Sequence, residues 1–182
     1  MKPAQAEFDL FDTPPEPRFD RFVELICAAI ETPVSIISLV GPDRQFFKAA
    51  RGLPEPWASL RETPLSHSFC QHVVAMERTL IVEDAILHPL VANNLAICDL
   101  GVIAYLGEPI RRDTGAIVGA VCAIDTKRRA WTERDLCILR IVADMINSEI
   151  ACLPHGPDVT SELPRKDTEP VAEIGAAKPM PV

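Results

Sequence analysis

The side chains that could perform chemistry gather between Ser66 and Tyr105. Cys70 and His72 stand at the start of a short predicted helix. A thiol near an imidazolium at a helix N-terminus acquires a lowered pKa and becomes nucleophilic. Residues two apart on a helix point to different faces, however, so Cys70 and His72 do not meet naturally. The spacing therefore favours a structural or pocket-lining role for Cys70 over a reactive one.

A metal site is the second chemistry that these residue types could support. The candidate ligands are His67, Cys70, His72 and His88, and Cys98 could complete the set. A closed zinc site needs four ligands and a catalytic site needs three. Only His67 and Cys70 have the helical spacing that places two ligands on one face. The sequence therefore predicts no metal site.

The third chemistry is recognition of a small molecule by polar side chains on loops. Carboxylates at Asp84 and Asp99 could accept hydrogen bonds from a ligand, and Tyr105 could stack on it or bond to it. Asp84 and Asp99 are equally suited to capping turns, since a short acidic side chain bonds readily to nearby backbone N–H groups. Both readings stay open for each of these residues.

The elements that must position these groups follow from periodicity and from turn signals. Helical spacing of apolar residues predicts a helix over 18–31, and β-branched runs predict strands. Turn signals at Gly41-Pro42-Asp43 and at 111–115 each join two consecutive strands into a hairpin. The segments 52–63 and 83–99 are predicted to be loops, the second with one helical turn at most. The expected strands cover 34–40, 44–51, 79–82, 102–110 and 116–125, and the expected helices cover 18–31, a short stretch ending at Val74, and 132–151.

The helix predicted over 132–151 carries two apolar stripes. Thr132 followed by Asp135 has the form of a capping box. A surface helix needs only one apolar stripe to cover its own core. The second stripe therefore predicts a homodimer formed through the terminal helices. The stripes consist of Leu136, Leu139, Ala143, Ile146 and Ile150, and of Ile138, Ile141, Val142 and Met145.

Length and composition bound the remaining possibilities. The chain has 182 residues, of which 48% are hydrophobic, and a net charge of −8. An acidic chain is not attracted to nucleic acid or to anionic membranes. No run of about 18 uncharged apolar residues suggests a membrane span, and the N-terminus does not resemble a signal peptide. Six cysteines without a CxxC pair are typical of free thiols in a reducing cytoplasm. We expect a tail over 1–16, one domain over 17–153, and a disordered, proline-rich tail over 154–182.

Five phrases in a fixed order resemble the GAF domain of bacterial signalling proteins. They are HSFCQHVV, VEDAxxHPLVANN, DLGVIAYLGEPI, GAIVGAVCAIDT and WTERDLxIL. The resemblance implies an α+β fold with a central antiparallel sheet, terminal helices packed on one face and a loop-covered pocket on the other. It also implies a non-enzymatic sensory or regulatory module that binds a small, unidentified ligand and signals through a dimer or a partner such as a histidine kinase. The residues expected at the ligand are Cys70, His72, Asp84, His88, Asp99 and Tyr105; no cofactor is identified.

Two alternatives stay open beside the sensor. The pair Cys98-Asp99, its spacing to Pro109, and Asp125 are similar to features of free methionine-(R)-sulfoxide reductase, a thiol enzyme with this fold. Other acids of that enzyme are replaced here by Tyr105 and Ala123, and the reaction needs an acid to protonate the departing oxygen. A ligand-free domain that serves only in dimerisation or protein interaction is the other alternative.

Overall fold

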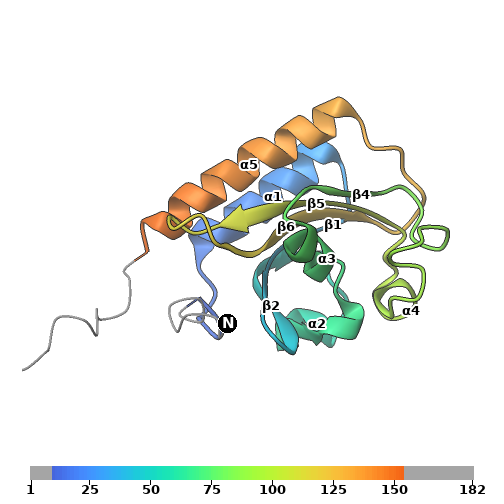
Figure 1. The fold of residues 1–182 in the computed structure, drawn as a ribbon, viewed down its shortest axis with the longest axis horizontal. Helices are drawn as coiled ribbons and strands as arrows, with labels where there is room; N and C mark the ends of the chain where they lie inside the picture. Colours follow the sequence, from blue (N-terminus) through green and yellow to red (C-terminus); the bar gives the residue numbers. More distant parts are fainter. Residues whose placement is uncertain (1–9, 154–182) are drawn as a thin grey trace, which may run out of the picture.

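The computed structural model describes residues 10–153, so the tail expected over 154–182 lies outside the described residues. Figure 1 shows two long helices lying side by side over one face of a sheet, with short helices and loops under the other face. In the described part of the chain, the elements are α1 (Pro17–Ile30), β1 (Val34–Val40), β2 (Arg44–Arg51), α2 (Trp57–Leu60), β3 (Glu62–Pro64), a 3-10 turn (Leu65–His67), α3 (Cys70–Met76), β4 (Leu80–Val82), α4 (Ala96–Leu100), β5 (Ala104–Arg111), β6 (Ile117–Asp125) and α5 (Glu133–Ala151).

Antiparallel pairing joins all six strands of this sheet in the order β3-β2-β1-β6-β5-β4. The predicted hairpins, β1–β2 and β5–β6, are therefore present. The central contact is between β1 and β6, where Gly119 lies against the backbone of Ser38 and Leu39. A Cβ atom at Gly119 would come within 1.9 Å of the Ser38 carbonyl oxygen, so glycine is required at this crossing.

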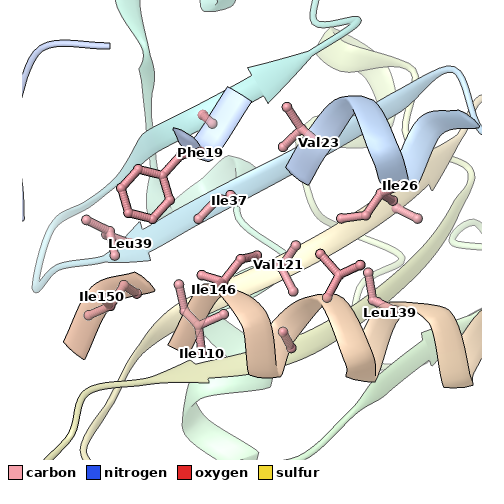
Figure 2. Close-up of a cluster of buried hydrophobic side chains, with 14 of the residues drawn as sticks. Phe19, Val23, Ile26, Ile37, Leu39, Ile110, Val121, Leu139, Ile146 and Ile150 are labelled. Carbon is pink, nitrogen blue, oxygen red and sulfur yellow. The ribbon is translucent and has the colours of Figure 1, made fainter. Parts of the chain in front are cut away.

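The upper face of the sheet is covered by α1 and α5. One face of each helix is apolar at helical spacing, and these faces meet the strands in a closed core (Figure 2). Fully buried members come from both helices and from β1, β5 and β6; they include Phe19, Ile26, Leu139, Ile146, Ile37, Leu106 and Val121. The expected α+β fold, with terminal helices on one face of an antiparallel sheet, is confirmed.

The predicted capping box at the start of α5 is confirmed. Thr132 Oγ1 accepts a hydrogen bond from the Asp135 backbone N–H at 3.2 Å, and Asp135 Oδ2 accepts one from the Thr132 N–H at 3.0 Å. These two bonds satisfy backbone donors that the helix itself leaves unpaired.

Two segments differ from the sequence-based expectation. The loop expected over 52–63 contains α2 and leads into a sixth strand, β3, which pairs with the edge of β2. Only three residues form β3, too few for any alternation to be visible in the sequence. Leu10, expected in a tail, is 5% exposed and belongs to the core beneath α1.

Candidate ligand-binding site

A cavity lies on the face of the sheet opposite α1 and α5. Its floor is formed by β1, β2, β5 and β6, and its cover by the 3-10 turn, α3, α4 and the segment that leads from α4 into β5. The lining consists of Ile36, Gln45, Phe47, His67, Phe69, Cys70, Ala96, Leu100, Val102, Tyr105, Cys122 and Ile124. The space between these side chains, including the part that is open to solvent, has a volume of about 310 Å³. The cavity is therefore small and partly open to solvent.

The alternation of side chains along each strand explains which residues reach the cavity. On β6, Cys122 and Ile124 line the cavity, while Val121 and Ala123, which alternate with them along the strand, pack under the long helices. On β5, Tyr105 lines the cavity and Leu106 lies in the helix-facing core. Each central strand thus contacts the cavity with one face and the helices with the other.

Cys70 and Tyr105, both predicted at the site, meet in its interior. The Tyr105 hydroxyl donates a hydrogen bond to Cys70 Sγ at 3.3 Å, and both side chains are buried. A hydrogen bond with the Cys122 thiol lowers the pKa of Cys70, and the bond from Tyr105 acts in the same direction although burial opposes it. Burial raises the pKa of Tyr105 and of Cys122 well above their usual values, so both stay protonated.

A buried polar network centred on Gln45 closes one end of the cavity. The Gln45 side-chain oxygen accepts hydrogen bonds from Ser38 at 3.0 Å and from Ser68 at 2.7 Å. Its amide nitrogen donates to Thr63 Oγ1 at 2.6 Å and to the His67 carbonyl at 3.5 Å. Ser68 Oγ also accepts from the Gln71 N–H at 3.1 Å, which supports the first turn of α3.

Within the cover of the cavity, His67 connects the 3-10 turn to α4. Its Nε2 lies 2.8 Å from Asp99 Oδ2, its Nδ1 lies 3.0 Å from Ser66 Oγ, and its ring packs against Trp57 with centroids 5.1 Å apart. The Leu95 N–H donates to the Ser66 carbonyl at 3.1 Å. Asp99, predicted at the site, therefore lies at the rim, with 51% of its side chain exposed.

The structure places the other three predicted residues away from the cavity. His72 of α3 is half-buried and does not belong to the lining. His88 accepts a hydrogen bond from the Leu90 N–H within its own loop. Asp84 accepts from the Ile86 N–H at 3.1 Å and pairs with Arg128 at 3.0 Å, which is the turn-capping arrangement weighed against a ligand role.

Sequence reasoning missed most of the cavity wall. Gln45 and Phe47 stand in a strand with no visible functional signal, and His67 was considered only as a metal ligand. Gln45 stands between Arg44 and Phe46, so nothing in the sequence indicates that it is buried and needs hydrogen-bond partners. Within residues 10–153, no group of three or more His, Cys, Asp or Glu side chains could hold a metal ion.

The fold and the cavity together define a small α+β domain with a cavity on the face of the sheet opposite its terminal helices, and comparison with known proteins identifies the family. The GAF domain family matches residues 14–150, and the chain belongs to that family. A cyclic di-GMP phosphodiesterase of Pseudomonas aeruginosa is 31% identical over 137 residues, which are 72% of this chain. The match spans only 22% of that larger protein.

Solved structures agree on the fold. The GAF domain of a phosphoenolpyruvate-protein phosphotransferase from Coxiella burnetii gives a TM-score of 0.63 at 18% identity, covering 81% of this chain and 89% of that one. Free methionine-R-sulfoxide reductase from Neisseria meningitidis gives 0.60 at 18% identity, covering 80% and 84%. No helix within residues 10–153 is both long enough and apolar enough to span a membrane.

Proposed function

We propose that this GAF domain is a non-enzymatic sensory or regulatory module of the cytoplasm. A small ligand occupies the cavity between the sheet and α3 and α4, and its presence is transmitted to a homodimer or to a signalling partner such as a histidine kinase. The observation that carries this proposal is a small, mostly apolar cavity whose floor is formed by strands that also support the two terminal helices.

The route from the cavity to the helices is short. Cys122 faces the cavity, and its neighbours Val121 and Ala123 pack in the core under the helices. A ligand that moves the β6 backbone must therefore shift the surface on which α5 rests, since packed cores transmit displacement rather than absorb it. Such a shift signals only if the ligand prefers one of two helix arrangements.

The outer surface of the helix layer supports the dimer. On α5, Ile141 is 55% exposed and Met145 is 46% exposed, one helical turn apart, and Leu25 of neighbouring α1 is 45% exposed. Exposed apolar side chains clustered across adjacent helices are typical of protein interfaces. The other members of the second stripe, Ile138 and Val142, are used within the domain's own core.

Sedimentation equilibrium tests the dimer. We expect the wild-type chain to dimerise at micromolar concentration, and Ile141→Glu to weaken association by about tenfold or more because it would bury a charge. Leu60→Glu is the matched control, since Leu60 is 56% exposed but lies on α2, on the opposite side of the sheet (Figure 1). A wild-type monomer at high micromolar concentration would rule out the homodimer.

Native mass spectrometry tests the ligand. The protein should be purified gently from its natural host, where a dimer carrying a discrete extra mass supports the sensor. A dimer without extra mass would instead favour a ligand-free interaction module, a reading that the small cavity also supports. The search would then turn to protein partners.

A thiol reductase is the second candidate, because Cys98 is exposed beside Asp99, which reaches the rim of the cavity. Asp125, the acid expected to assist, is buried and pairs with Arg129 at 3.4 Å. This candidate requires NADPH consumption with a thioredoxin system and free methionine sulfoxide, with loss of turnover in Cys98→Ser. Absence of turnover in the wild type would exclude it.

A further inference from the structure

The wall of the cavity carries no formal counter-charge for an ionic ligand. Among the described residues, no Lys, Arg, Asp or Glu side chain belongs to the lining. The nearby Lys48 of β2 bonds instead to Glu16 and Thr13 at the start of α1. Moving an isolated ion from water into such surroundings costs far more than moving a neutral molecule of the same shape.

The polar groups of the wall already have partners inside the domain. The Gln45 amide makes four hydrogen bonds, which is the full capacity of its two N–H donors and of the two lone pairs of its oxygen. Both ring nitrogens of His67 are engaged, and the Tyr105 hydroxyl donates to Cys70. Within residues 10–153, the buried side-chain N and O atoms without a partner belong to Thr32, Glu108 and Arg112, none of which lines the cavity.

The remaining surface of the cavity is apolar. Phe47 and Phe69 provide aromatic faces, while Ala96, Val102 and Ile124 provide aliphatic ones. A polar ligand would lose its hydration here without gaining hydrogen bonds in return, whereas an apolar ligand loses nothing. The chemistry of the wall therefore selects by both charge and polarity.

The small volume of the cavity favours movement of its cover when a ligand of the size of an aromatic ring enters. The shorter of the two α-helices in the cover is α4, with five residues. Its attachments include the bond between His67 and the half-exposed Asp99 and the backbone bond from Leu95 to Ser66. A bond to an exposed carboxylate exchanges readily with water, so α4 is the element that can yield at low cost.

We propose that the cavity takes a small, uncharged and predominantly apolar molecule, of about the size of a single aromatic ring, which enters by displacing α4. This inference rests on the proposed sensory function and specifies the ligand class for it. It excludes nucleotides, amino acids and carboxylic acids as ligands of this cavity, because each would bring an ionised group to a wall without a counter-charge.

The test is a charge series on one ring. Toluene, benzoate and benzylammonium share a ring and one further carbon, and differ chiefly in charge. Each is titrated into the full chain, with binding followed by methyl NMR shifts of Ala96 and Val102. We expect saturable shifts with toluene and at least about tenfold weaker binding of both ions, from the cost of desolvating a charge. Equal or tighter binding of either ion, or no saturable shift with toluene, overturns the proposal.

A pair of variants shows where toluene binds. Ala96→Leu adds three carbons inside the cavity and should weaken toluene binding by about tenfold or more, because it occupies the site. Ala92→Leu makes the same change four residues earlier at an exposed position outside the lining, and should bind toluene as the wild type does. Unaltered toluene binding by a folded Ala96→Leu overturns the proposal. If this variant does not fold, the charge series on the wild-type chain decides the question.

The inference and the proposed function can fail separately. If an ionic molecule copurifies with the protein and shifts the Ala96 and Val102 signals, the ligand class is wrong and the sensor stands. If toluene binds selectively while the α1 and α5 signals and the association constant stay unchanged, the ligand class stands and the sensor lacks its output.

Discussion

Gln45 is the residue on which the cover of the cavity depends. Its side chain joins Ser38 of β1, Thr63 of β3 and Ser68 before α3, all of them buried. Replacing one partner of a buried hydrogen bond leaves the other unsatisfied, at a cost of about 1–3 kcal/mol for each group. We therefore expect Gln45→Leu to lower the free energy of unfolding by about 3 kcal/mol in urea titrations.

Gln71→Leu is the control for this prediction. The Gln71 amide nitrogen donates only to the carbonyls of Leu65 and Ser68, and its side chain is half-buried. Solvent can reach such a site and replace lost bonds, so the expected cost is about 1 kcal/mol. Equal costs for the two substitutions would show that the Gln45 network has no special role.

His72 provides a pH-dependent signal at the residue scale. Burial, and secondarily the charge of His88, lower the pKa of His72 below its usual 6.5. The unfolded chain therefore binds this proton at a higher pH than the folded chain does. The contribution of His72 to the free energy of unfolding is fully present above pH 6.5. It decreases as the pH falls from 6.5 through the lowered pKa of the folded chain. An NMR titration of the His72 ring should show the depressed midpoint.

A second histidine variant separates the two causes. His88→Gln removes the smaller, electrostatic cause and should raise the pKa of His72 partway toward 6.5, while burial keeps it depressed. The pH dependence of unfolding should become shallower below pH 6.5 in the same variant. An unchanged His72 midpoint in His88→Gln would mean that the two rings do not interact.

At the scale of elements, an ion pair attaches the start of α1 to β2. The Lys48 side chain is 3% exposed and its ammonium contacts the Glu16 carboxylate, Thr13 Oγ1 at 2.6 Å and the face of Phe19. Removing one partner of a buried pair strands the other charge. We expect Glu16→Gln to destabilise the domain by about 2 kcal/mol, measured by chemical denaturation.

The double-mutant cycle gives this prediction its control. Lys48→Met replaces the buried ammonium with an apolar chain of similar length, a change that is often nearly neutral. In the Lys48→Met background, Glu16→Gln should cost less than about 1 kcal/mol, because no buried charge is left unpaired. If Glu16→Gln costs the same in the wild-type and the Lys48→Met backgrounds, the loss of stability comes from the N-terminus of α1 and not from the Glu16–Lys48 ion pair.

The elements that the sequence predicted are those with long, regular patterns. The helices α1 and α5 and the strands β1, β2, β5 and β6 appear within two residues of their expected ends, because apolar periodicity over seven or more residues identifies both type and extent. The missed elements, α2 and β3, have four and three residues. Elements this short are held by their neighbours and leave no periodic signal.

The candidate site was harder to predict than the fold for a related reason. Cys70 and Tyr105, which line the cavity, were predicted at the ligand from their residue types and from the resemblance to GAF domains. Asp84, His72 and His88 were predicted there on the same grounds, and their side chains lie outside the lining. The cavity is assembled from side chains of many elements, and their convergence depends on tertiary packing that no local pattern contains.

At the scale of the whole molecule, the proposed ligand and the proposed dimer must obey a reciprocal relation. If an occupied cavity favours association, association must favour occupancy by the same free energy. A dimer holds two cavities, so a tenfold preference of toluene for the dimer at each site tightens association about a hundredfold at saturation. The double variant Ile141→Glu/Met145→Glu, expected to be monomeric, should then bind toluene about tenfold less tightly than the wild-type dimer. Calorimetry of both proteins and sedimentation with and without toluene measure the two sides of this relation independently. Equal toluene affinities in monomer and dimer would show that the sheet does not connect the cavity to the surface of α5, whatever each does separately.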